Sequence, residues 1–415
     1  MQAPSADTLH LLSRNPVFSA AKSVWGYEIQ AASDLSAGVP PDRESVGATV
    51  IAGDYVGLKN ILARSKKMLL AYSREQLAQF VPRAIPAQSS VILLGPACQR
   101  DPELDRALAR LVREGHTLAL EWDPLVTPEA PCLDVAAMLC LAGPGMVADS
   151  GLRDALTRGD AAKDCLVRNV VTRSEAESLI GLGATLFQGP FFKTAEIIPG
   201  RRLSSHQNSR LQLLRVVEGE NPDLDALART IQADVSLSYR LLSYLNSPAF
   251  GFMRKIDSIR QAITLLGWIN VRNWLRAVLM ADMAQGEIQV EVLHVSLWRG
   301  RFLEQLVAQN DFWDFRPDEM FLMGMFSLLD AILGVSMSEA LARLPLTEAQ
   351  KKALMASGPT EYAPLLNLLP ALEDGEGLGP DRMLQDLSLN ADAARRLHLE
   401  AGAWAAAILD LGPRN

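Results

Sequence analysis

The side chains best suited to bind a metal ion or to act as nucleophiles, cysteine and histidine, are scattered along this chain. No two cysteines have the C-x-x-C spacing, and no two histidines are sequence neighbours. Zinc sites are usually built from such closely spaced pairs, so the sequence predicts no cysteine or histidine metal cluster. We expect the thiols to be reduced and mostly buried. The residues concerned are Cys98, Cys132, Cys140 and Cys165, and His10, His116, His206, His294 and His398.

Carboxylates that end or follow apolar runs are the other candidates for chemistry. Glu28 ends the segment Val24-Trp-Gly-Tyr-Glu28, and Glu121 and Asp123 follow Leu118-Ala-Leu120. Carboxylate oxygens are the ligands that Mg²⁺ and similar hard cations prefer. The alternative is that Glu28 is solvated or ion-paired and that Glu121 and Asp123 are ordinary loop charges after a strand.

The length and composition indicate a globular chain of more than one domain. Its 415 residues exceed the about 100 to 200 residues of a usual domain, so we expect two domains, or three. Hydrophobic residues make up 49% and charged residues 21%, which is enough apolar surface for real cores. The formal charge of −8 has the wrong sign for coating nucleic acid or an anionic membrane, and we expect neither partner.

Targeting signals and membrane spans are not predicted. The segment Met1 to His10 has no basic stretch followed by an apolar one, as a secretory signal would. The longest nearly charge-free stretches, Val135 to Ala148 and Phe321 to Met337, fall short of the about 20 apolar residues that a membrane helix needs. We therefore expect a cytoplasmic protein.

The first half of the chain alternates strand-like and helix-like segments. Val91–Leu94 has the pattern of a buried strand, Pro102–Gly115 has apolar residues at helical spacing, and Thr117–Trp122 has the pattern of a further strand. The rhythm recurs with Asp134–Leu141 and Ala184–Phe187. Parallel strands with crossover helices follow, either as an α/β barrel or as an open α/β sheet.

The second half lacks this strand signal. Leucines and isoleucines recur there at three- and four-residue steps, which predicts stacked amphipathic helices and an all-α domain. We place the boundary at Pro199-Gly200. The predicted domains are therefore 1–198, and 199–415 with a helical extension at its C-terminal end.

The ends of the first half resemble a known bacterial family. Arg14-Asn-Pro-Val-Phe18 and Val24-Trp-Gly-Tyr-Glu28 are similar to the start of an EAL domain, and Phe187-Gln-Gly-Pro-Phe-Phe192 is similar to its closing segment. EAL domains are barrel-type phosphodiesterases of cyclic di-GMP that use metal-binding carboxylates. The resemblance therefore implies a TIM-type barrel.

The second half resembles the HDOD domain, a relative of the HD phosphohydrolases that usually lacks their metal site. The similar stretches are Leu237–Leu242, Asn246–Gly251 and Ile259–Ile263, followed by Leu266-Gly267. An EAL-like domain followed by an HDOD domain is itself a known bacterial family. The likeness covers roughly residues 9 to 370.

The resemblance implies which residues of an EAL active site would remain and which would be lost. Glu28, Glu121 and Gln188 stand at matching positions, and we expect Gln188 to close the barrel rather than to contact a ligand. The usual arginine grip after the signature is missing, because Ala31-Ala-Ser33 stands there. The positions at which donors are lost are Ala71, Leu94, Trp122, Ala137 and Val171.

In the helical half, the resemblance places Gly300 where an HD hydrolase has a histidine and Ser327-Leu328 where it has its His-Asp pair. What remains is a candidate interaction surface, although the turn within it would equally dock two helices against each other. The residues of this surface are Asn246, Phe250, Arg254, Lys255 and Arg260.

These losses predict a non-catalytic signalling protein: not an enzyme, with no cofactor and no metal. It would act through contacts with other signalling proteins in a cyclic di-GMP or two-component network. The resemblance also implies a homodimer through the EAL-like domain. Two alternatives stay open, a sensor that binds cyclic di-GMP or another nucleotide in the barrel, and a residual metal-dependent phosphodiesterase.

Overall fold

The computed structural model divides into two compact units, the first ending at Phe192 and the second beginning at Lys193. The predicted boundary at Pro199-Gly200 lies shortly after this division. The residues that the structure describes are 12–31, 61–62, 64–96, 102–157, 162–197, 203–219, 228, 231, 234–245, 258–310, 315–374 and 379–410.

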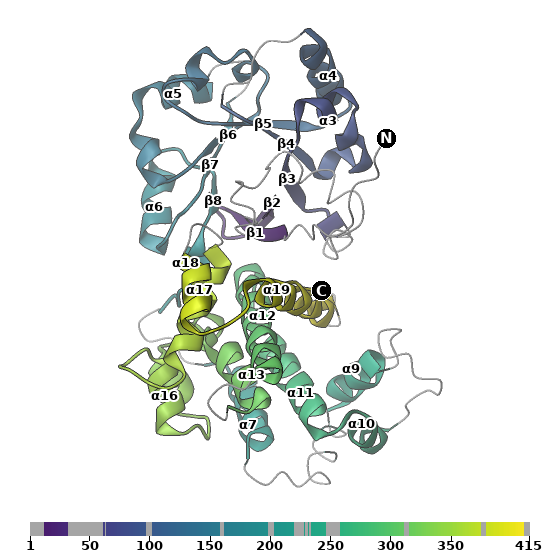
Figure 1. Ribbon diagram of the computed structural model, residues 1–415. Helices are drawn as coiled ribbons and strands as arrows, with labels where there is room; N and C mark the ends of the chain where they lie inside the picture. Colours follow the sequence, from purple (N-terminus) through teal and green to yellow (C-terminus); the bar gives the residue numbers. More distant parts are fainter. Residues whose placement is uncertain are drawn as a thin grey trace. The chain divides into compact units, whose positions relative to one another are not determined.

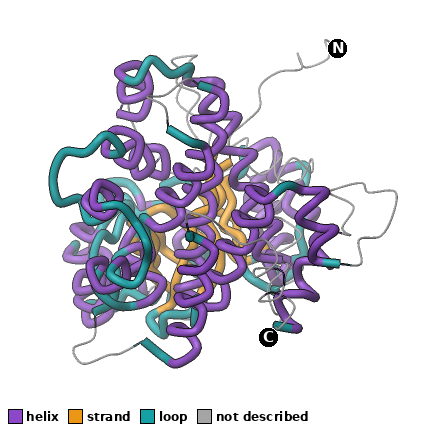
Figure 2. Tube along the Cα trace, turned by 90° about the horizontal axis from the view of Figure 1, so that it is seen from below, coloured by secondary structure: helices purple, strands orange, loops and turns teal. Residues whose placement is uncertain are grey.

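Eight strands in the described part of the first unit form a closed barrel in sequence order (Figure 1), and Figure 2 draws them in orange. Strand β1 is antiparallel to both of its neighbours, β2 and β8, and all other neighbours are parallel. This confirms the α/β barrel and excludes the open sheet. The strands are β1 (Leu12–Ser19), β2 (Val24–Ala31), β3 (Lys67–Ala71), β4 (Ser90–Leu94), β5 (Thr117–Glu121), β6 (Met138–Leu141), β7 (Asp164–Val167) and β8 (Leu186–Gln188).

Helices connect the parallel strands. In α4 (Pro102–Arg113), Leu104, Leu108 and Leu111 lie on one buried face, as their spacing predicts. The other connections are α3 (Arg74–Ala78), α5 (Ser150–Thr157), α6 (Arg173–Gly181) and the 3₁₀ segments Val81–Ala84, Ala87–Ser89, Thr127–Glu129, Pro131–Leu133 and Pro144–Ala148; a further 3₁₀ segment, Pro190–Lys193, follows β8.

Alternate residues of each strand point into the barrel. The residues that pack together there are apolar and come from seven of the strands, so the middle of the barrel is a filled core. They are Val17, Leu69, Val91, Leu93, Ala119, Met138, Cys140, Leu166 and Leu186.

The cysteines differ in part from expectation. Cys132 is disulfide-bonded, so the prediction of reduced thiols is wrong for this residue. Cys140 in the barrel core and Cys165 on the opposite face of its strand are free and buried, as predicted. Burial raises the pKa of the Cys165 thiol to about 11, which keeps it protonated.

The described part of the second unit is helical, which confirms the all-α prediction. Helix α12 packs along α13 and α19 and forms the centre of the unit. The helices are α7 (Ser205–Val217), α9 (Val235–Leu245), α10 (Ile259–Leu266), α11 (Trp268–Met283), α12 (Glu287–Gln309), α13 (Pro317–Phe326), α14 (Leu329–Leu333), α15 (Met337–Leu341), α16 (Glu348–Leu354), α17 (Ala363–Asp374), α18 (Gly379–Asp386) and α19 (Ala391–Asp410).

Two glycines let α12 and α13 approach each other closely. A Cβ atom at Gly300 would lie 2.8 Å from the Phe321 carbonyl oxygen, and one at Gly324 would lie 2.5 Å from the Arg299 carbonyl oxygen. No helix among the residues placed in the structure combines the length and apolar character needed to cross a bilayer.

Candidate functional site

A buried ionic cluster lies inside the barrel, where side chains from three strands meet. The Arg168 guanidinium, directly after β7, donates from Nη2 to Oε1 of Glu28 at 2.7 Å and from Nε to Oε2 at 3.1 Å. Its Nη1 donates to Oε1 of Glu121 at 3.2 Å. We call these three residues the Arg168 cluster.

The strand pattern explains why these side chains meet. Glu28 on β2 is in register with Leu69, whose side chain belongs to the barrel core, and neighbours in register share a face. Glu121 follows the inward Ala119 by two residues, and Arg168 follows the inward Leu166 by two. All three therefore point into the barrel, and Glu121 and Arg168 lie at the carboxyl ends of their strands.

The Arg168 cluster is mostly buried, and only Glu121 is partly exposed to solvent. The side chain of Glu28 is 2% exposed and that of Arg168 is 10% exposed, whereas Glu121 keeps 23%. Burial, the largest single effect, would lower the pKa of Arg168, but the negative charges around it and its hydrogen bonds to Glu28 together raise the pKa, so the guanidinium stays charged. On the neighbouring strand, Cys140 is in register with Glu121, and burial raises the pKa of its thiol to about 12, so this thiol is neutral.

Gln188 adds a buried side-chain amide to this end of the barrel. Its backbone closes the barrel by pairing with Val17, and its side chain follows the inward Leu186 by two residues. The Oε1 atom is buried and accepts no hydrogen bond from the described residues. Gly189 then turns with φ +146, and a Cβ there would lie 2.3 Å from the Val170 carbonyl oxygen. The Gln-Gly pair thus fixes where the amide points.

Three expected lost-ligand positions are shifted by one residue from the barrel interior. The inward residues are Leu93, Glu121 and Met138, so Leu94, Trp122 and Ala137 are not interior positions. This is a correction of the alignment, caused by the two-residue period of strands.

The two remaining positions of that set are placed differently. Ala71 packs against the core of the barrel. Val171 lies in a loop, 58% exposed, and its N–H donates to Oε2 of Glu175. The interior residue of this strand is Arg168, which sequence reasoning passed over. The available signal was a charged residue directly after the apolar run Cys165-Leu-Val167.

The donors described here do not form a site for a divalent ion. No group of three or more carboxylate, histidine or cysteine side chains suited to a metal occurs within the described ranges. The two carboxylates of the Arg168 cluster already bind a guanidinium. We therefore derive no metal-dependent step at this site.

In the second unit, three positions are expected to match the metal site of an HD hydrolase. Gly300 is used for the α12–α13 approach, and Leu328 is buried. Ser327 Oγ accepts from Arg299 Nη1 at 3.0 Å and donates to the Gly324 carbonyl at 2.7 Å. These positions therefore have packing and hydrogen-bonding roles.

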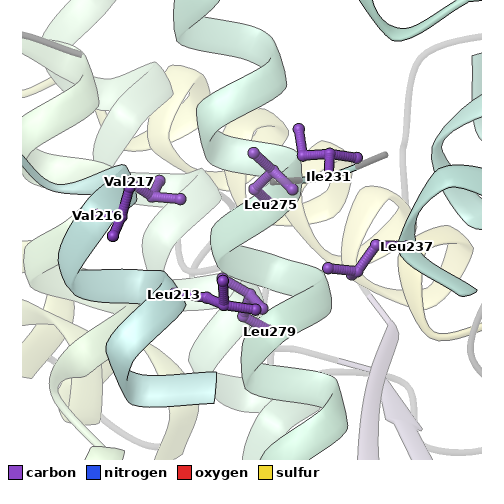
Figure 3. Close-up of a pocket in the computed structure, with 7 residues that line it drawn as sticks. All are labelled: Leu213, Val216, Val217, Ile231, Leu237, Leu275 and Leu279. Carbon is purple, nitrogen blue, oxygen red and sulfur yellow. The ribbon is translucent and has the colours of Figure 1, made fainter. Parts of the chain in front are cut away.

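The candidate interaction surface is mostly outside the described residues, which include none of Asn246, Phe250, Arg254 and Lys255. Arg260 lies on α10, but its side chain is not described. Figure 3 shows a small pocket of the helical unit, formed by aliphatic side chains of α7, α9, α11 and Ile231, with no group for chemistry. Its lining residues are Leu213, Val216, Val217, Ile231, Leu237, Leu275 and Leu279.

Comparison with protein families matches the model of the HDOD domain to residues 203–355. The second unit carries an HDOD domain. The match begins just before α7 and ends just after α16, so α17 to α19 lie beyond it.

Two relatives match almost the whole chain. The "Cyclic di-GMP phosphodiesterase CdgJ" of Vibrio cholerae is 27% identical over 411 residues, 97% of this chain and 94% of that protein. The "Uncharacterized protein YuxH" of Bacillus subtilis is 26% identical over 412 residues, 96% and 98% of the two chains. The name of the first points to an enzyme, and this contradicts the prediction that the chain is not one.

Solved structures give weaker similarities. An EAL domain protein from Listeria monocytogenes is 13% identical with a TM-score of 0.32, covering 44% of this chain and 87% of that one. A putative phosphohydrolase from Shewanella amazonensis is 14% identical with a TM-score of 0.38, covering 50% and 94%. Similarity at this level carries no functional information.

Proposed function

We propose that this chain takes part in cyclic di-GMP signalling and acts on the nucleotide at the carboxyl end of its barrel. The observation that carries the proposal is the Arg168 cluster with Gln188, a set of charged and amide groups beside the apolar core of the barrel. Barrels of this kind place their active sites at this end. The Vibrio cholerae relative, named a cyclic di-GMP phosphodiesterase, supplies the substrate class and favours hydrolysis.

The chemistry of cyclic di-GMP suits the groups present. Each guanine base carries N–H donors, which the Oε1 of Gln188, without a donor among the described residues, and the partly exposed carboxylate of Glu121 are able to accept. The nucleotide also carries two phosphodiester anions. Within the cluster, the Arg168 cation offsets one of the two carboxylate charges, that of the buried Glu28.

Hydrolysis and binding by the full-length chain test this proposal. Cyclic di-GMP would be incubated with the protein in Mg²⁺, in Mn²⁺ and in chelator, with the linear product followed by chromatography and binding followed by calorimetry. We expect hydrolysis above the buffer rate. Replacing Gln188→Ala should weaken binding about 3- to 10-fold through the loss of one hydrogen bond.

The matched control is Gln79→Ala, an exposed glutamine just after α3 on the outside of the barrel, which should leave binding unchanged. If the wild-type chain neither hydrolyses cyclic di-GMP nor gives heat with it, the proposal is wrong.

We also propose that the helical unit binds protein partners. Support comes from large apolar side chains that are exposed to solvent on α9, α10 and α11. Tyr239 is 72% exposed, and Leu265 and Ile269 are each 51% exposed. Exposed aromatic and aliphatic groups of this kind often anchor interfaces. Affinity purification with the full chain and with Tyr239→Ala should show a partner that the variant loses. Trp274 and Trp298, in contrast, are buried core residues.

A further inference from the structure

We propose that Arg168 is a permanent internal cation that occupies the place at Glu28 where a divalent metal ion would have to bind. The wild-type barrel therefore takes up no metal ion at this carboxylate. This inference deepens the proposed function, because it states how the charge of the site is set.

The guanidinium of Arg168 already contacts both carboxylate oxygens of Glu28. The two nitrogens Nη2 and Nε lie 2.7 and 3.1 Å from Oε1 and Oε2, so the guanidinium covers both oxygens in a fork. A Mg²⁺ or Ca²⁺ ion binds carboxylate oxygens at about 2.0 to 2.6 Å. The ion and the guanidinium would then share one small space with like charges, which is unfavourable in a shielded site.

Arg168 also bridges from one strand end to another. Its third nitrogen, Nη1, lies 3.2 Å from Oε1 of Glu121, so one guanidinium holds carboxylates from β2 and β5 together, as a bridging ion would. A guanidinium is planar and stays protonated at every physiological pH, whereas a bound ion exchanges with solution. The charge at this end of the barrel is therefore independent of metal supply.

The residues around the Arg168 cluster offer few ligand atoms for a metal ion. Cys140, in register with Glu121, is a neutral thiol, and Gln188 contributes one amide oxygen. Neighbouring inward positions such as Leu93 and Ala71 have no donor atoms. In the described part of the chain, the cluster thus has one cation that fits and no second set of ligands.

The test is a titration of the full-length chain with Mn²⁺, without nucleotide, after removal of metals with a chelator. Free Mn²⁺ is counted by electron paramagnetic resonance, which reads binding directly. We expect the wild type and Glu28→Gln to bind Mn²⁺ identically. A site that the wild type has and Glu28→Gln lacks would overturn the proposal.

The gain-of-site variant is Arg168→Met, which removes the guanidinium and leaves a shorter, unbranched apolar side chain. We expect it to bind Mn²⁺ at least about tenfold more tightly than the wild type, with the gain lost again in Arg168→Met/Glu28→Gln. No gain in a folded Arg168→Met would overturn the proposal, because the guanidinium would then not be what excludes the ion.

Two controls keep the outcomes separate. Arg153→Met changes an exposed arginine on α5 and should bind Mn²⁺ as the wild type does. If Arg168→Met does not fold, as circular dichroism would show, the comparison of wild type with Glu28→Gln still decides. Failure to act on cyclic di-GMP would count against the proposed function only, since no nucleotide is present in this titration.

Discussion

Lys193 and Glu373 stand 180 residues apart in the sequence, and their Nζ and Oε2 atoms are 2.6 Å apart in the helical unit. The same carboxylate is held by Arg299 of α12, whose Nη2 lies 2.9 Å from Oε2. All three side chains are less than one-fifth exposed. The pair therefore joins the first residue of the second unit, the middle of α12 and the end of α17 through one buried charge.

The first prediction concerns that charge. Glu373→Gln removes the carboxylate and leaves two buried cations without compensation, which should lower the free energy of unfolding by about 3 to 5 kcal/mol. Burial would raise the pKa of Glu373, but Arg299 and Lys193 hold it below its ordinary value, so the carboxylate is ionised at neutral pH. Urea unfolding followed by tryptophan fluorescence measures the change.

The control for this variant is Glu348→Gln. The Glu348 side chain is 81% exposed and pairs with Lys351 one helical turn away, so its loss should change the free energy of unfolding by less than about 0.5 kcal/mol. Equal effects of the two substitutions would show that the buried ion pairs of Glu373 stabilise the protein no more than an exposed pair does.

The second prediction is a pH dependence caused by His398. Its ring packs edge-on against Trp298 at 4.7 Å, and burial lowers its pKa to about 4, although Glu373 acts in the opposite direction. The unfolded chain takes up a proton near pH 6.5 that the folded chain refuses. Stability is thus complete above about pH 6.5 and falls, by on the order of 1 to 3 kcal/mol, as the pH drops towards 4.

The difference between wild type and His398→Phe isolates this effect, because phenylalanine keeps the aromatic contact and cannot titrate. Free energies of unfolding measured from pH 7.5 to 4 should fall more steeply for the wild type than for the variant. Parallel curves would mean that His398 binds its proton equally in both states.

Sequence periodicity was sufficient for the elements of the barrel but not for its charged centre. The expected segments Val91–Leu94, Pro102–Gly115 and Thr117–Trp122 agree with β4, α4 and β5 to within one or two residues, because each carries its own apolar pattern. The pairing of Arg168 with Glu28 spans 140 residues. No local pattern encodes such a contact, which depends on the closure of the barrel.

Because side chains alternate between the two faces of a strand, an alignment error of one residue assigns a side chain to the wrong face. This explains why Leu94, Trp122 and Ala137 were expected in the barrel interior. Leu93 and Leu94 are both apolar, so the run Ser90–Leu94 does not show which of them points inward. Only the pairing of β4 with β3 and β5 resolves it. In the helical unit, the resemblance predicts a lost histidine at Gly300, whereas the structure shows a close approach of two helix backbones there, which the sequence alone does not reveal.

The third prediction follows from that approach. Gly324→Ala places a Cβ 2.5 Å from the Arg299 carbonyl oxygen, and neither backbone is able to move without separating α12 from α13. Overpacking of this kind should lower the free energy of unfolding by about 1 to 3 kcal/mol.

Gly402→Ala in α19 is the matched control, since its Cβ meets only Trp298 Cδ1 at 3.9 Å. There the better helix propensity of alanine should stabilise the protein by about 0.5 to 1 kcal/mol. Thermal unfolding of the two variants should therefore shift in opposite directions, and a shift of the same sign would show that the close crossing does not require glycine.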